Sequence, residues 1–311
     1  MDPGQSGAIL PTHRSKPEPG NADNPSPMKF LFIVFQHLVP QHLLSRLAGK
    51  LANATTPWLK NIMIKRFIRH YGVNMTEALR SDAEDYACFN DFFTRALNPG
   101  ARTIDDAGSI LVSPADGVVS AAGNITGDQL FQAKGKNFSL TALLGGSDTM
   151  ANAFLDGSFV TVYLSPKDYH RVHMPCGGTL QKMIYIPGKL FSVNQTTSEN
   201  IDDLFARNER VVCLFDTDAG PLAVILVGAM IVAGIETVWS GQIAPARHGI
   251  SETSYTTHQP AIQLARGEEM GRFKLGSTVI LLSGPGAVQW QQALEENTAL
   301  RMGEKIGDVL G

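Results

Sequence analysis

The sequence predicts an α+β fold, in which N-terminal helices precede a mainly antiparallel β-sandwich or barrel-like domain. Up to about residue 100, apolar residues recur at helical spacing. After that point, short apolar runs are separated by Gly, Pro, Asp and Asn, which is typical of strands joined by turns. Because helices do not alternate regularly with these strands, an antiparallel arrangement is favoured over a doubly wound parallel sheet.

The composition excludes several classes of protein. A chain of 311 residues with 43% hydrophobic and 18% charged residues is globular and can bury a large core. Its net charge of -3 gives no attraction to nucleic acid, and we expect no such partner. The three cysteines lack CxxC spacing, so neither a disulfide framework nor a thiolate zinc site is indicated. The longest uncharged apolar run, residues 222–235, is too short to span a bilayer and predicts a buried pair of strands.

Three regions are expected along the chain. Residues 1–27 contain six prolines among Gly, Asn, Asp and Ser, which predicts a disordered tail. Residues 28–100 are expected to be helical, including a helix within residues 75–98. Residues 101–311 are expected to form the β-rich domain, interrupted by one helical segment over residues 140–155.

The helical region is strongly basic at its start. Between residues 28 and 70 there are seven Lys or Arg and no Asp or Glu. Apolar residues there recur at helical spacing with cations between them, which suits a helix lying in a membrane interface. A helical cap that packs on the main domain and exposes its basic face to solvent fits the same pattern.

Three separate motifs carry groups that can do chemistry. Ser277 follows a glycine and opens an apolar run, as in a turn that leads into a buried strand. Asp116 lies in a Pro-Ala-Asp-Gly turn, and His170 and His173 follow the apolar run 159–164. Each has an ordinary structural explanation by itself, but together they supply a hydroxyl nucleophile, a base and an orienting carboxylate. The two histidines have no clearly spaced further ligands, so we expect no metal site.

The order and spacing of these motifs resemble the bacterial phosphatidylserine decarboxylase family. The resemblance rests on Pro-Ala-Asp-Gly, Tyr-His-Arg-Val-His-Met-Pro and Phe-Lys-Leu-Gly-Ser-Thr. It continues through Gln-Ala-Lys-Gly-Lys-Asn, Pro-Gly-Lys-Leu-Phe-Ser-Val-Asn, Leu-Phe-Ala-Arg-Asn-Glu-Arg and Ile-Glu-Thr-Val-Trp. It covers the chain from about residue 28 to about residue 285, so the N-terminal tail lies outside it.

The resemblance implies that the chain is a proenzyme that cuts itself. In this family the serine attacks the carbonyl of the preceding glycine, here Gly276, and converts the amide bond into an ester. His173 would be the base for this step and Asp116 would orient its ring, so that Asp116, His173 and Ser277 form a charge relay. β-Elimination would then divide the chain into residues 1–276 and 277–311, leaving a pyruvoyl group in place of Ser277.

The resemblance also implies the reaction. The pyruvoyl group forms a Schiff base with the headgroup amine of phosphatidylserine, which loses carbon dioxide to give phosphatidylethanolamine in phospholipid biosynthesis. Neither pyridoxal phosphate nor a metal is expected as a cofactor. The family match assigns His170 to decarboxylation, and from its position we infer that it reprotonates the product carbanion.

A lipid substrate favours the membrane interpretation of the basic helices. We expect a peripheral protein on the cytoplasmic side of the cell membrane, with phosphatidylserine in the bilayer as its substrate. The large and small chains of one precursor are expected to stay together as a heterodimer, which can itself dimerise.

Two other interpretations are compatible with the same residues. A Ser-His-Asp hydrolase would keep Ser277 intact and attack an external ester or amide, although the sequence lacks the G-x-S-x-G elbow and its strand follows the serine. A β-rich membrane-binding module would use the same His and Asp side chains only for packing. Both alternatives predict a chain that stays in one piece.

Overall fold

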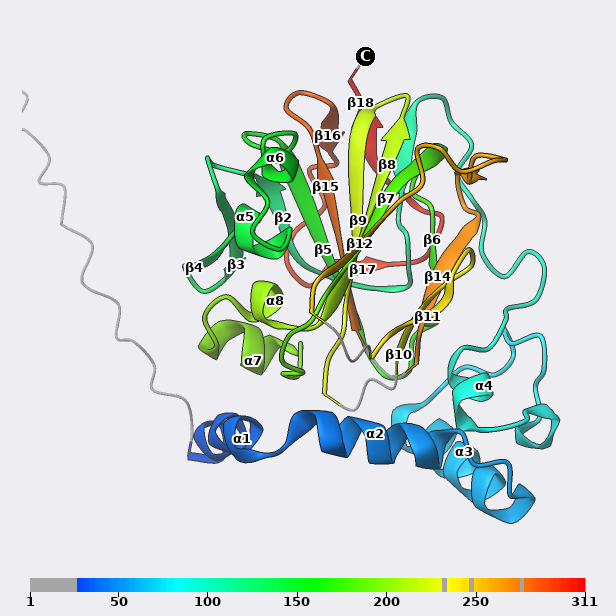
Figure 1. Cartoon of the computed structure of the whole chain (residues 1–311). Coiled ribbons are helices and arrows are strands. Elements are labelled where there is room, and N and C mark those ends of the chain that lie inside the picture. The colour runs from blue at the N-terminus through cyan, green and yellow to red at the C-terminus, as the bar shows by residue number, and fades with distance from the viewer. Residues whose placement is uncertain (1–26, 231–233, 246–248, 275–276, 311) are drawn as a thin grey trace, which may run out of the picture.

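The computed structural model describes residues 27–230, 234–245, 249–274 and 277–310 (Figure 1). It confirms the α+β fold, with N-terminal helices and a mostly antiparallel β domain. The described strands form open sheets and no closed barrel. The predicted tail lies outside the described residues except for Pro27, which is the first residue of a helix. The division of the chain at residue 100 stays a prediction.

Three helices line one end of the molecule (Figure 1). They are α1 (Pro27–Leu38), α2 (Gln41–Ala52) and α3 (Pro57–Tyr71). Pro40 separates α1 from α2, because proline lacks the backbone N–H that a continuous helix needs. Gly72 ends α3 in the left-handed conformation, with φ 66°. None of the described helices combines the length and the apolar composition needed to cross a bilayer.

Two helix predictions are wrong in detail. The helix expected within residues 75–98 is reduced to the 3-10 turn η1 (Ala83–Asp85) and the short helix α4 (Phe89–Phe93). The segment expected over residues 140–155 is divided into α5 (Leu140–Leu143) and α6 (Asp148–Ala151). The break lies at the pair Gly145-Gly146, whose φ angles of 82° and 86° end a right-handed helix.

The described strands form four antiparallel sheets. The largest has the order β12-β7-β8-β9-β15-β5-β2-β17, with β13 also paired to β7. Smaller sheets have the orders β11-β10-β14-β6, β1-β18-β16 and β3-β4. The strand bounds are β1 (Ile110–Val112), β2 (Gly117–Asn124), β3 (Gln129–Ala133), β4 (Lys136–Ser139), β5 (Ser158–Leu164), β6 (Arg171–His173), β7 (Gly178–Ile186), β8 (Arg210–Thr217), β9 (Gly220–Val227), β10 (Gly234–Thr237), β11 (Gly241–Ala244), β12 (Ser251–Ser254), β13 (Gln263–Leu264), β14 (Glu269–Lys274), β15 (Ser277–Ser283), β16 (Val288–Trp290), β17 (Ala299–Leu300) and β18 (Lys305–Val309).

Strand β15 lies inside the largest sheet, paired with β5 on one side and β9 on the other. All of its residues are buried. Val279 and Leu281 face one core, whereas Ile280 and Leu282 face the other. Both faces of the strand are therefore covered, which explains why its sequence is a continuous apolar run although the sheet is antiparallel.

Different elements pack on the two faces of the large sheet. One face of the large sheet packs against the smaller sheets, through residues such as Ile306 of β18 and Phe273 of β14. The other face packs against the short helices α5 and α6 and against α7 (Gln195–Asn200) and α8 (Leu204–Arg207). A third cluster joins α3 to α4 at the helical end. The β domain is thus a layered structure with β15 at its centre.

Gly117 provides a test of the packing between β2 and β5. A Cβ atom at this position would lie against the backbone carbonyl oxygen of Tyr163, far inside van der Waals contact, so one strand has to shift. We expect Gly117→Ala to lower the free energy of unfolding by about 1–3 kcal/mol, measured by urea unfolding. Gly123→Ala in the same strand is the matched control, because its Cβ would be 3.8 Å from the nearest atom, in Phe159. The control should change stability by less than about 0.5 kcal/mol, and equal losses in both variants would contradict the steric explanation.

Candidate active site

Ser277 is the first residue of the central strand. It pairs with Leu164, the last residue of β5, and its side chain is fully buried. Its hydroxyl Oγ has no hydrogen-bond partner within the described part of the chain. The preceding Gly276, where self-cleavage is expected, lies outside the described residues. An unpaired hydroxyl in the protein interior is unfavourable, so such a group calls for a functional explanation.

His170 lies in the loop that leaves β5 near Leu164. The Asp168 carboxylate accepts hydrogen bonds from the Ser165 N–H and hydroxyl, both at 2.7 Å, which shapes the turn before His170. The ring is fully buried and lies 4.1 Å from the ring of Phe93, centroid to centroid. Its Nδ1 donates to the Asp168 carbonyl at 2.8 Å, and its Nε2 has no partner among the described residues. Since a carbonyl can only accept, the neutral ring carries its proton on Nδ1 and exposes a free lone pair on Nε2.

Burial also sets the charge of this imidazole. Desolvation lowers the pKa of His170 to about 3, and the nearby positive charge of Arg95 acts in the same direction. His170 is therefore neutral at physiological pH. In that state Nε2 is a proton acceptor, so any role as a proton donor requires that it first takes up a proton.

His173, three residues further along the chain, is the last residue of β6. Its Nδ1 donates to the Gly267 carbonyl at 2.8 Å, and by the same argument its Nε2 accepts from the Tyr169 hydroxyl at 3.0 Å. Burial lowers the pKa of His173 and raises the pKa of Tyr169. The imidazole is therefore a neutral base, and the tyrosine stays a protonated donor.

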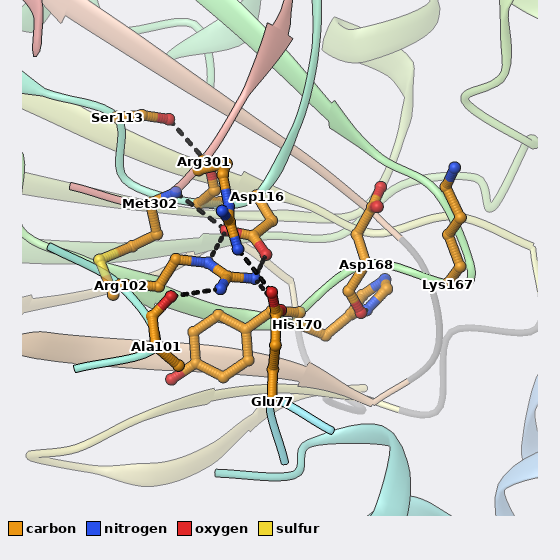
Figure 2. Close-up of polar contacts among 12 residues, drawn as sticks. Glu77, Ala101, Arg102, Ser113, Asp116, Lys167, Asp168, His170, Arg301 and Met302 are labelled. Carbon is orange, nitrogen blue, oxygen red and sulfur yellow. Dashed lines mark hydrogen bonds and ion pairs between the residues drawn. The ribbon is translucent and has the colours of Figure 1, made fainter. Parts of the chain in front are cut away.

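Asp116 belongs to the turn before β2 and is held by an arginine (Figure 2). Arg102 contacts both carboxylate oxygens, with its Nε 2.8 Å from Oδ1. The Met302 N–H also donates to Oδ1, at 2.9 Å. Arg102 reaches Glu77 at 2.9 Å as well, and Glu77 pairs with Arg301 at 2.6 Å. Two carboxylates and two guanidinium groups thus form one network, which raises the pKa of Arg102.

The structure brings the Asp116 turn close to His173, but it does not join the two side chains. The His173 N–H donates to the Pro114 carbonyl at 2.8 Å, so the turn that carries Asp116 lies directly against β6. The negative charge of Asp116 also acts on the His173 ring. Within the described residues, however, no hydrogen bond connects Asp116 with His173, whose two ring nitrogens face Gly267 and Tyr169. The role of each site residue stays a prediction.

Several contacts at the site were not predicted from the sequence. Tyr169 lies inside the Tyr-His-Arg-Val-His motif, and its position beside two histidines was a usable signal. Arg102 and Gly267 had no such signal in the sequence, because they come from segments that reach the site only through the tertiary fold. No group of three or more His, Cys, Asp or Glu side chains in the described ranges is arranged to hold a metal ion.

The arrangement suits proton transfer away from bulk water. A buried hydroxyl begins a strand, and two neutral imidazoles lie in the loop and strand that follow its hydrogen-bonded neighbour β5. Neutral imidazole can remove a proton, and a nearby carboxylate such as Asp116 stabilises the imidazolium that forms.

Comparisons with known proteins agree with these observations. The model of the phosphatidylserine decarboxylase family matches residues 89–308, and a second model, described as PSD, matches residues 31–72. The phosphatidylserine decarboxylase proenzyme of Hahella chejuensis is 56% identical over 280 residues, which are 90% of this chain and 94% of the relative. The proenzyme of Marinobacter nauticus is also 56% identical over 280 residues, with 90% and 98% covered, and that of Bordetella avium is 55% identical over 276 residues, with 89% and 94% covered. The chain therefore belongs to the phosphatidylserine decarboxylase family, and it is a decarboxylase, that is, a carboxy-lyase.

Proposed function

We propose that this chain is a self-cleaving proenzyme whose mature form converts phosphatidylserine to phosphatidylethanolamine at a membrane surface, in phospholipid biosynthesis. One observation carries the proposal: the buried hydroxyl of Ser277, without a partner among the described residues, starts the central strand, and two neutral imidazoles follow the end of β5, whose last residue pairs with Ser277. The match to proenzymes over about nine tenths of the chain supports the same assignment.

The proposed cleavage consumes one water molecule. Ser277 Oγ attacks the Gly276 carbonyl carbon, and the C–N bond breaks as the C–O bond forms, which gives an ester and a free amine. Loss of the Ser277 Cα proton then expels the Gly276 carboxylate and leaves dehydroalanine. Its imine tautomer is hydrolysed, so that ammonia departs and a ketone remains at position 277. The products are residues 1–276 and the pyruvoyl chain 277–311.

His173 is the proposed base for the first step. In its neutral tautomer the basic atom is Nε2, which accepts a hydrogen bond from Tyr169. That hydroxyl has to leave Nε2 before the ring can take a proton from Ser277. The carboxylate of Asp116, which Arg102 fixes in place, then favours the imidazolium through its charge, while the charge of Arg171 opposes this effect.

The residues around Ser277 also fit a pyruvoyl group made from it. Two buried polar atoms, Ser277 Oγ and His170 Nε2, have no partner in the described ranges, as expected for a site that is completed by a modified residue and its substrate. Such a group supplies a ketone that condenses with the headgroup amine and withdraws electrons as the carboxylate leaves. His170 is the proposed group that takes up and returns a proton, and Phe93 covers one face of its ring.

The membrane proposal rests on how α1 and α2 are oriented. Their glutamines face the β domain: Gln36 Oε1 accepts from the Ser192 N–H and Gln41 Oε1 from the Leu190 N–H, each at 2.7 Å. Large apolar side chains of the three helices are instead exposed, namely Met28, Leu31, Phe35, Leu38, Leu43, Leu47, Leu51, Trp58 and Ile62. A soluble helix has the opposite arrangement. A set of exposed apolar side chains of this kind suits insertion into the acyl boundary of a bilayer.

A cavity of about 660 Å³ behind this surface gives room for a lipid. It lies between α2, α3 and α4, and most of its lining is apolar, including Leu51, Phe67 and Phe93. Arg66 adds a positive charge to the lining. Because Phe93 also contacts His170, we propose that acyl chains enter from the helical side while the headgroup reaches the catalytic histidine.

Replacing the nucleophile gives the first test. Ser277→Ala should abolish self-cleavage, because no hydroxyl remains to attack Gly276, and decarboxylase activity should fall below detection. Intact-mass spectrometry of wild type should show two chains divided after Gly276, the smaller one carrying a ketone. The variant should show one chain. Ser283→Ala, at the buried other end of the same strand, is the matched control and should still cleave. An uncut wild-type chain would favour the hydrolase or binding-module interpretation.

The pH dependence of cleavage gives the second test. Because burial lowers the pKa of His173 below the usual value of about 6.5, the neutral base persists to lower pH. The cleavage rate should therefore stay constant as pH falls through about 6.5 and decline only below it. Time courses of precursor from cell-free translation, resolved on gels, would measure this. A rate that already falls tenfold per pH unit from about 6.5 would argue against His173 as a buried base. His258→Gln, at an exposed histidine, should leave the profile unchanged.

The exposed apolar surface gives the third test. Leu43 and Leu47 are 53% and 55% exposed, so a Leu43→Glu/Leu47→Glu double variant should fold normally. We expect its flotation with phosphatidylserine vesicles to fall about tenfold or more, since each leucine that leaves the acyl region forfeits about 1.5–3 kcal/mol. Leu310→Glu is the control: Leu310 is 45% exposed and follows β18, at the end of the molecule opposite the helices (Figure 1). Undiminished flotation of the double variant would refute the proposed orientation.

A further inference from the structure

A second, polar cavity lies beside the loop that carries His170. It has a volume of about 250 Å³, and its lining includes Asn74, Arg95, Arg102, Lys167 and Tyr169. Its lining also includes Gly72, where α3 ends. The cavity therefore connects the proposed membrane-facing helices with the loop that carries His170.

Arg95 is the unusual residue in this lining. Its side chain is buried, with 3% of the residue exposed, and its Nη2 donates to the carbonyls of Lys167 at 3.0 Å and Asp168 at 3.3 Å. Its guanidinium carbon also lies 5.6 Å from the centroid of the Phe92 ring. The remaining nitrogens, Nε and Nη1, have no hydrogen-bond partner within the described residues. Buried and unpaired N–H groups of a cation are costly unless something fills the positions opposite them.

The acidic side chains that line the cavity are already engaged. Arg102 holds Asp116 and Glu77, and the Asp168 carboxylate accepts from Ser165. Among the described residues, no ion pair involves Arg95. The cavity lining thus includes a buried guanidinium with N–H groups that lack a partner among the described residues, and an oxyanion is the chemical group that pairs with them.

The position of this charge relates it to the reaction. The Asp168 carbonyl oxygen accepts hydrogen bonds from both Arg95 Nη2 and His170 Nδ1. Guanidinium and imidazole therefore meet at one oxygen atom. A ligand that bridges the unpaired nitrogens of Arg95 would have its neighbouring atoms near the catalytic histidine.

We propose that Arg95 binds the phosphodiester of the substrate headgroup and so positions the serine moiety for decarboxylation, an inference that rests on the proposed function. The headgroup carries two oxyanions, the carboxylate and the phosphodiester. Binding the carboxylate to a guanidinium would stabilise the charge that the reaction removes, and this would raise the barrier. The phosphodiester keeps its charge throughout, so holding it orients the substrate without such a penalty.

The test compares steady-state kinetics of Arg95→Gln, Arg95→Lys and wild type on soluble dihexanoyl-phosphatidylserine. Arg95→Gln should raise KM about tenfold or more, as expected for losing charge-assisted hydrogen bonds, and leave kcat within about twofold. Arg95→Lys should lie between the two. Arg80→Gln is the matched control, because Arg80 belongs to the same region but pairs with Asp91 at 2.6 Å. It should behave like wild type.

Two soluble inhibitors separate the two oxyanions. Glycerophosphoethanolamine carries the phosphodiester without a carboxylate, and L-serine carries a carboxylate without the phosphodiester. The Arg95→Gln change should weaken inhibition by glycerophosphoethanolamine at least fivefold and leave inhibition by L-serine unchanged. The reverse pattern, or a lower kcat with unchanged KM, would overturn the proposal.

Intact mass shows first whether each variant matures. If Arg95→Gln stays uncut, the KM and kcat of Arg95→Lys are compared with those of wild type instead. An unchanged KM in Arg95→Lys overturns the proposal, and a KM raised at constant kcat supports it. Mature wild type without decarboxylase activity would instead refute the proposed function.

Discussion

The pairing of β15 with β5 and β9 is the interaction on which the site depends. Backbone ladders on both sides fix the start of the strand, so Ser277 is placed by hydrogen bonds that do not involve its side chain. Cleavage before Ser277 would free the first residue of the strand and leave both ladders intact. In the proposed mature enzyme, the small chain would thus remain the central strand of a sheet whose other strands belong to the large chain.

Further strand pairings and polar contacts add to this attachment. The small chain would also contribute β18, paired with β1, and β17, paired with β2. Arg301 and Met302 reach the network of Glu77, Arg102 and Asp116, so both proposed chains contribute to the environment of the Asp116 carboxylate (Figure 2). Because charges in such a network support one another, losing one member would leave others buried without partners. In the proposed mature enzyme, chain association and the environment of Asp116 would therefore be coupled through the same residues.

The sequence predicted features with a local signal and missed those that depend on distant contacts. The run after Ser277 has a strand pattern in its own residues, and β15 begins there. By contrast, one hydrogen-bond partner of His173 is Gly267, which lies 94 positions away, and Arg102 is recognisable only once its segment packs on the Asp116 turn. The single helix over residues 140–155 was wrong because apolar spacing outweighed the Gly145-Gly146 pair in that interpretation.

The buried glutamines of α1 and α2 have a consequence for judging helix orientation from hydropathy. Gln36 and Gln41 satisfy backbone N–H groups of the segment around Leu190 and Ser192 that would otherwise be left without acceptors. The side of these helices that carries the glutamines thus packs on the β domain, and the apolar side is exposed. Hydropathy alone would therefore orient both helices wrongly, because it would turn their most apolar side toward the protein.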